Sequence, residues 1–196
     1  MTYPFIIVEG IDGAGKATQV EELQKLARKR RERVFVHKFP TQNPKKVHEH
    51  LQGKTKLSED ELFEQYSKDI MEVQDKIKYD LGLGWVICDR YIVSTVAYQS
   101  VEAGIEKRIA QIEKMNLLKP DTIIWIDLPV DVAMERKSKQ KTPDRHEADR
   151  KFLEKVAQNY EELYKREFLI ENWIRVWGDE EPRIITKEIR NALNDE

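Results

Sequence analysis

Short apolar runs alternate with longer amphipathic, charge-rich segments along the 196-residue chain. The apolar runs occupy residues 5–8, 34–36, 85–88, 122–126 and 173–177. Each run is short and most are rich in β-branched or aromatic residues, a composition typical of buried parallel strands. The pattern therefore predicts five strands.

The segments between these runs carry apolar residues at helical spacing. The clearest stripes are Val20, Leu23, Leu26 and Ala27; Leu62, Tyr66, Ile70, Val73, Ile77 and Leu81; and Phe152, Val156, Tyr160 and Leu163. Strand–helix alternation repeated five times predicts an α/β fold with helices on both faces of a parallel sheet. Ligands of such sheets bind beyond the carboxyl ends of the strands, so the residues that follow each strand form the candidate site.

The composition is that of one globular domain, with 40% apolar residues and a nearly balanced charge of −2. This balance argues against a strongly basic nucleic-acid-binding protein. Cys88 is the single cysteine, which excludes an internal disulfide and fits a reducing compartment. The N-terminus lacks the basic start of a secretory signal, and no apolar run approaches the length of a membrane span. We expect a soluble cytoplasmic protein.

A glycine-rich segment, residues 10–18, follows the first predicted strand and reads Gly-Ile-Asp-Gly-Ala-Gly-Lys-Ala-Thr. The glycines allow backbone N–H groups to surround a phosphate, and the helix that follows adds its positive N-terminus. We expect Lys16 to be exposed and to reach the β- and γ-phosphates of ATP. The expected ATP-binding residues of this loop are Gly10, Gly13, Ala14, Gly15, Lys16, Ala17 and Thr18.

One position of the loop departs from the usual pattern. The Ser or Thr that normally follows the lysine and holds Mg²⁺ is Ala17, and the hydroxyl stands one position later, at Thr18. Phosphate oxygens and water can hold the metal in its place, because Mg²⁺ keeps much of its hydration shell. We therefore expect ATP and Mg²⁺ as cofactors, with weak metal binding by the free protein.

Asp89 and Arg90 follow the third apolar run and place a carboxylate and a guanidinium at the expected site. A guanidinium can bind a transferring phosphoryl group through two parallel hydrogen bonds. The alternative is a salt bridge at a strand end, and the neighbouring phosphate-binding loop favours the functional interpretation. Phe39, at the end of the second strand, either floors a base pocket or is a core aromatic; sequence alone favours the core.

Residues 136–147, after the fourth strand, are polar, dense in cations and broken by Pro143. Phosphoryl transfer needs positive charge on the moving group and exclusion of water, which a mobile basic lid provides. A solvated charged helix face is the alternative. The place of this segment in the chain favours a lid.

These motifs together resemble the thymidylate kinase family almost from end to end. The matching blocks are residues 8–16, 39–40, 89–91 with 94–95 and 97–99, and 144–147 before a long helix. The resemblance implies a P-loop NTPase domain over residues 1–196, with a five-stranded parallel sheet in the order 2-3-1-4-5. It also implies a homodimer that transfers the γ-phosphoryl group of ATP to dTMP in deoxynucleotide biosynthesis.

The resemblance assigns roles to individual residues on the acceptor side. It places Asp12 near the 3′-hydroxyl and phosphates of the acceptor, where it is also a candidate Mg²⁺ ligand, directly or through water. It places Arg90 between the two nucleotides, on phosphate, and Tyr98 against the sugar. The full set of expected acceptor-binding residues is Asp12, Phe39, Tyr66, Lys68, Asp89, Arg90, Thr95, Tyr98 and Gln99.

The resemblance also indicates where the catalytic arginine stands. Gly13 occupies the position at which some members carry an arginine in the phosphate-binding loop. This chain is similar to the members that supply the arginine from the lid, with Arg145 the first candidate and Arg136 the second. The expected catalytic residues are Lys16, Asp12, Arg90 and Arg145.

The acceptor side departs from the family pattern at two places. Thr41 and Gln42 stand where an arginine usually contacts the dTMP phosphate. Counting back from Asp89 for the thymine-stacking aromatic and its base-reading arginine gives Glu64 and Lys68, or Tyr66 and Ile70 after a shift of two. Tyr66 is the candidate for stacking, with core packing the alternative. Three functions therefore stay open: a dTMP kinase, a kinase of another (deoxy)nucleoside monophosphate or of a deoxynucleoside, and a nucleotide-binding paralogue with weak turnover.

Overall fold

A computed structural model describes residues 3–139 and 150–194 of the chain. Its strands are β1 (Phe5–Glu9), β2 (Val34–Lys38), β3 (Trp85–Asp89), β4 (Thr122–Asp127) and β5 (Trp173–Trp177). The five predicted strands are therefore confirmed. All are parallel and lie in the order β2-β3-β1-β4-β5, as the family resemblance implied.

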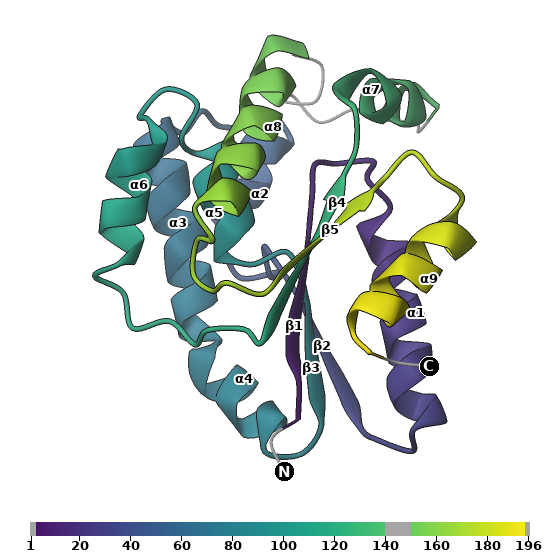
Figure 1. The fold of residues 1–196 in the computed structure, drawn as a ribbon. Coiled ribbons are helices and arrows are strands. Elements are labelled where there is room, and N and C mark those ends of the chain that lie inside the picture. The colour runs from purple at the N-terminus through teal and green to yellow at the C-terminus, as the bar shows by residue number, and fades with distance from the viewer. Residues whose placement is uncertain (1–2, 140–149, 195–196) are drawn as a thin grey trace.

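Helices connect the strands and cover both faces of the sheet (Figure 1). Helices α1 and α9 lie on one face, and α3, α4, α5, α6 and α8 lie on the other. The helices are α1 (Lys16–Lys29), α2 (Lys45–Leu51), α3 (Glu59–Glu72), α4 (Gln74–Leu81), α5 (Ile92–Tyr98), α6 (Ile105–Ile112), α7 (Val130–Ser138), α8 (Arg150–Lys165) and α9 (Pro182–Ala192). None of the helices in this described part combines the length and apolarity that crossing a membrane needs.

The core lies on the three central strands. All five residues of β1 and of β3 are buried, as are the first five of β4. This burial on both faces explains why these strands read as continuous apolar runs instead of alternating ones. It also makes Glu9, a fully buried acid at the end of β1, an exception that needs a structural account.

The apolar stripe from Leu62 to Leu81 is divided between α3 and α4, which meet at Val73. The side chain of Gln74, just after this junction, accepts hydrogen bonds from the Tyr91 hydroxyl (3.0 Å) and from Leu118 N (2.8 Å). It also donates to Ile70 O (2.8 Å). These long-range partners tie the junction to the start of α5, which helical spacing alone does not reveal.

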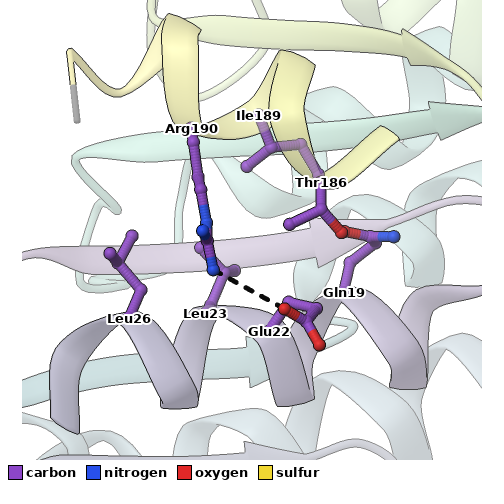
Figure 2. Close-up of a pocket in the computed structure, with 7 residues that line it drawn as sticks. All are labelled: Gln19, Glu22, Leu23, Leu26, Thr186, Ile189 and Arg190. Carbon is purple, nitrogen blue, oxygen red and sulfur yellow. Dashed lines mark hydrogen bonds and ion pairs between the residues drawn. The ribbon is translucent and has the colours of Figure 1, made fainter. Parts of the chain in front are cut away.

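Helix α9 packs across α1 and holds the helix that follows the phosphate-binding loop (Figure 2). Thr186 Oγ1 donates to Gln19 Oε1 (2.9 Å), and Arg190 Nη2 pairs with Glu22 Oε2 at 3.6 Å. Leu23 on α1 lines the same shallow crevice between the two helices. The C-terminal helix thereby fixes α1 in place.

Candidate functional site

The phosphate-binding loop turns between β1 and α1 at the carboxyl edge of the sheet (Figure 1). Gly10 has a φ of 143°, and a Cβ atom there would lie 2.6 Å from Ile126 O, so only glycine fits. Gly13 and Gly15 have φ angles of 86° and 90°, and Gly15 precedes the first residue of α1. The loop therefore presents backbone N–H groups and a helix N-terminus, the arrangement that binds phosphate.

The expectation that Lys16 is exposed is wrong. The residue is 7% exposed, and its Nζ donates to Gly10 O (3.0 Å) and Ile11 O (2.9 Å). Burial and the nearby Arg90 lower the pKa of Lys16 to about 7, although Asp12 opposes the shift. The side chain folds back because the carbonyl oxygens of its own loop satisfy the ammonium group. Bound phosphates would supply the negative charge that restores a full positive charge to this lysine.

Asp12, Arg90 and Tyr98, predicted from separate parts of the sequence, come together beside this loop. Arg90 Nη2 lies 2.5 Å from Asp12 Oδ1, and the guanidinium lies 5.1 Å from the centre of the Tyr98 ring. The backbone N–H of Asp12 donates to the Tyr98 hydroxyl at 3.3 Å. The cluster pairs a charged guanidinium with a carboxylate and leaves the Asp12 side chain 34% exposed.

Asp89 is buried at the end of β3 and pairs with Lys38 Nζ at 3.3 Å. Lys38 ends the neighbouring strand β2 and was not among the sequence candidates. The sequence did carry a signal for it, because Lys38 and Asp89 are the last residues of adjacent parallel strands. Phe39 is 4% exposed and lies edge-on to Tyr91, with ring centroids 5.9 Å apart, which is the core position that sequence favoured.

The candidate acceptor residues on α3 point in different directions. Tyr66 is half-buried, whereas Lys68 is exposed and lies 3.8 Å from Glu72 on the same helix. Phe63 is a buried aromatic on this helix that the sequence analysis missed, and the Arg108 guanidinium lies 4.4 Å from its ring centre. Its signal was its position next to Leu62, at the edge of the apolar stripe.

Asp69, also on α3, anchors the segment that follows β2. Its carboxylate is buried and accepts hydrogen bonds from Thr41 N (2.8 Å) and from the Thr41 hydroxyl. Thr41 O in turn lies 2.7 Å from His48 Nε2 on α2. Thr41 and Gln42, the two positions that depart from the family pattern, therefore differ. Thr41 is hydrogen-bonded to α3 and α2, whereas Gln42 is exposed.

Thr95 on α5 and Gln99, which follows the last residue of that helix, are both buried. The carbonyl of Gln99 accepts a hydrogen bond from Arg108 Nε (2.6 Å). Its side-chain Oε1 and the Ser67 hydroxyl are buried and have no hydrogen-bond partner in the described part of the chain. This region thus keeps unused hydrogen-bonding capacity on α3 and just after α5.

Arg136 lies against the phosphate-binding loop, on the last turn of α7. Its Nη1 donates to Gly13 O (3.2 Å) and Gly178 O (3.1 Å), and its Nη2 lies 3.4 Å from Asp179. Residues 136–138 of the predicted lid therefore belong to a helix. Arg145 and most of that segment lie outside the described residues.

The residues near the loop suit a magnesium ion held mainly by phosphate oxygens and water. Asp12 is the partly exposed carboxylate beside the loop, and Ala17 offers no side-chain oxygen. Residues 3–139 and 150–194 contain no cluster of three or more acidic, histidine or cysteine side chains arranged to hold a metal ion. Asp12 could hold Mg²⁺ through water, because this ion keeps much of its hydration shell.

Comparison with known proteins places the chain in a family. A model of the family described as thymidylate kinase matches residues 8–189. A "probable thymidylate kinase" from Methanocaldococcus jannaschii is 35% identical, over 81% of this chain and 80% of that protein. A thymidylate kinase from Alcanivorax borkumensis is 32% identical over 82% of each chain, and one from Thermosipho melanesiensis is 29% identical over 97% of each. With the P-loop fold and the phosphate-binding loop in place, the chain belongs to the thymidylate kinase family.

Proposed function

We propose that this chain transfers the γ-phosphoryl group of ATP to dTMP, forming ADP and dTDP, in deoxynucleotide biosynthesis. The observation that carries the proposal is the cluster of Arg90, Asp12 and Tyr98 beside the phosphate-binding loop. A guanidinium in this place can bind phosphate between a nucleotide on the loop and an acceptor beyond β3. The family membership and the names of the relatives support dTMP as that acceptor.

In the proposed mechanism, a phosphate oxygen of the acceptor attacks the γ-phosphorus in line with the leaving oxygen. Catalysis rests on positioning and on stabilisation of charge, without a covalent enzyme intermediate. Lys16 and Arg90 stabilise the charge that develops on the transferring group, and Asp12 orients the acceptor. Mg²⁺, bound with ATP, supplies further positive charge to the phosphates. We assign Arg145 to the same group as an arginine donated by the lid.

Further residues complete the proposed site and assembly. We assign the loop residues Gly10, Gly13, Ala14, Gly15, Ala17 and Thr18, together with Arg136, to ATP. The contact of Arg136 with Gly13 O supports this assignment, because it places a cation directly on the loop. We also propose that the protein works as a homodimer, as the family resemblance implies, and in the cytoplasm, which its single cysteine favours.

The acceptor site is proposed to bind the dTMP phosphate less tightly than the family norm. A charge-assisted hydrogen bond contributes about 1.5–3 kcal/mol, so loss of the usual arginine weakens binding by about ten- to a hundredfold. Thr41 cannot replace that contact while it is bonded to Asp69, and Gln42 is uncharged. Lys38 ends β2, three residues before Thr41, and offers a cation, but an ammonium lacks the bidentate geometry of a guanidinium.

The test is coupled ADP release with dTMP, dUMP, dCMP, dGMP, AMP and thymidine as acceptors. We expect dTMP to give the highest kcat/KM, and Gln42→Arg to lower KM for dTMP by about tenfold, the gain of one charge-assisted contact. Asn43→Arg is the matched control, because it adds the same charge at the next exposed position. Thymidine outperforming dTMP would favour a nucleoside kinase, and no ADP release with any acceptor would favour a nucleotide-binding paralogue.

A further inference from the structure

Glu9 is a fully buried carboxylate at the end of the otherwise apolar strand β1. It lies in register with Trp125 on β4, in the middle of the sheet. A charged group in such a place is destabilising unless hydrogen bonds compensate its loss of hydration. The partners of Glu9 therefore indicate what it does.

One oxygen of Glu9 holds the start of α5. Its Oε1 accepts hydrogen bonds from the backbone N–H groups of Tyr91 (2.8 Å) and Ser94 (3.3 Å). Tyr91 is the N-cap residue of α5, and no side chain of that helix caps it. The carboxylate of Glu9 thus satisfies the N–H groups that a helix start leaves without partners.

This contact places Arg90 between two fixed points on β1. The backbone N–H of Arg90 donates to Val8 O (3.0 Å), and the next N–H, that of Tyr91, donates to Glu9. Arg90 has a φ of 69°, a left-handed conformation that is unfavourable for a non-glycine residue and persists only where its surroundings impose it. Glu9 is therefore part of what aims the Arg90 guanidinium at Asp12.

The other oxygen of Glu9 connects to α8. The Tyr160 hydroxyl donates to Glu9 Oε2 (3.1 Å) and also lies 3.5 Å from Gly10 O in the phosphate-binding loop. The Tyr160 ring stacks on Trp125, with centroids 6.1 Å apart and planes 11° apart. Helix α8 packs beside α5 on the same face of the sheet (Figure 1). One carboxylate thus joins the loop, the Arg90 turn and α8.

We propose that Glu9 is a positioning residue that, through its bonds to Tyr91, Ser94 and Tyr160, couples the place of α8 to the orientation of Arg90. The inference rests on the phosphate-binding role proposed above for Arg90. Glu9 is not proposed to touch a reacting atom. It acts by holding the backbone on which Arg90 stands.

The test compares kcat and KM of three single variants. Glu9→Gln keeps the shape and one acceptor oxygen but removes the charge, whereas Tyr160→Phe removes one hydroxyl. We expect kcat to fall by about ten- to a hundredfold in Glu9→Gln and by about two- to tenfold in Tyr160→Phe. In each variant, KM for ATP and KM for dTMP should stay within about twofold of the parent values. Tyr164→Phe is the matched control, because Tyr164 lies one turn later on α8 and contacts Trp125 and Trp173 through its ring. It should leave kcat unchanged.

Three further measurements separate positioning from simple loss of structure. The double variant Glu9→Gln/Tyr160→Phe should be no slower than Glu9→Gln, because both changes break one connection. In an Arg90→Lys background, Glu9→Gln should lower kcat by less than about twofold, since the group that it positions is already altered. Melting temperatures show whether each variant folds, and if Glu9→Gln does not, the comparison of Tyr160→Phe with Tyr164→Phe decides.

The pH profile gives an independent readout. The charged or titratable groups that face Glu9 are Lys16 on α1, Cys88 on β3, Arg90 before α5 and Tyr160 on α8. Burial raises the pKa of Glu9 to about 7, against the lowering effect of Arg90. If the ionised form positions Arg90, kcat of the parent rises with pH through about 7, and Glu9→Gln lacks this limb.

The outcomes distinguish this inference from the function on which it rests. Parent-like kcat in both Glu9→Gln and Tyr160→Phe would overturn the inference and leave the kinase function untouched. An undiminished effect of Glu9→Gln in the Arg90→Lys background would also overturn it, because Glu9 would then act independently. Unchanged kcat in Arg90→Ala would instead remove the proposed role of Arg90 itself.

Discussion

At the scale of single residues, the site contains two buried groups of opposite charge with pKa values moved toward neutrality. Burial lowers the pKa of Lys16 to about 7 and raises that of Glu9 to about 7. Shifts of this kind in a cluster of polar groups are typical of functional sites. The charge of the site is therefore sensitive to its ligands, because a bound phosphate favours the protonated lysine.

This sensitivity predicts that ATP binding takes up protons. At pH 8 most Lys16 side chains are neutral in the free protein, and the phosphates of ATP raise the pKa of Lys16 above that pH. Calorimetric titrations in buffers of different ionisation enthalpy should report uptake of up to about one proton, the stoichiometry of one titrating group. Lys16→Met should remove the uptake. Equal binding heats in all buffers would contradict the protonation of Lys16 on ATP binding.

At the scale of elements, the sequence predicts the strands well because both faces of β1, β3 and β4 are buried. The spacing of apolar residues and the composition of a segment cannot reveal hydrogen bonds between distant elements, however. The junction of α3 and α4 at Val73 depends on what Gln74 contacts, and the burial of Lys16 depends on two carbonyls of its own loop. Glu9 was visible as an acid that ends an apolar strand, but its partners come from α5 and α8.

The segment after β2 is also held by a hydrogen bond to a distant element, the Asp69 carboxylate on α3. We therefore predict a selective effect of Asp69→Asn. The two hydrogen bonds from Thr41 reach different oxygens of the Asp69 carboxylate, whereas an asparagine offers only one oxygen, so the segment beside the proposed acceptor phosphate loosens. We expect KM for dTMP to rise by about two- to tenfold, the effect of one hydrogen bond, with kcat and KM for ATP within twofold. Asp75→Asn, at an exposed position on α4, is the control. An equal rise in both KM values would show a general loss of structure instead.

At the scale of the whole molecule, the parallel sheet gathers the ends of β1, β2, β3 and β4 at one edge. The phosphate-binding loop, Lys38, Asp89 and Arg90 follow or end these strands, so residues far apart in sequence share one site. This arrangement also buries Glu9 at the end of β1 and Lys16 at the start of α1. Their burial costs stability, and we propose that it serves the site, a compromise that active sites often show.

Glu9 and Lys16 make the stability of the fold depend on pH. The pKa of Glu9 is 4.5 when unfolded and about 7 when folded, so the folded state binds more protons between these values and stability falls as pH rises from 4.5 to 7. For Lys16, with 10.5 unfolded and about 7 folded, the unfolded state binds more protons between 7 and 10.5, so stability rises with pH there. Near pH 7, therefore, the burial of Glu9 and the burial of Lys16 both destabilise the folded state.

Glu9→Gln removes the cost of burying the Glu9 charge without changing the shape of the side chain. We expect its melting temperature to exceed that of the parent at pH 7.5 by at least about 2 °C, the shift that about 1 kcal/mol gives in a domain of this size. At pH 5 the difference between the two melting temperatures should be smaller, because Glu9 is then protonated in the parent. Scanning calorimetry at both pH values measures the difference. Equal destabilisation at both would mean that the hydrogen bonds of Glu9 to α5 outweigh the cost of burying its charge.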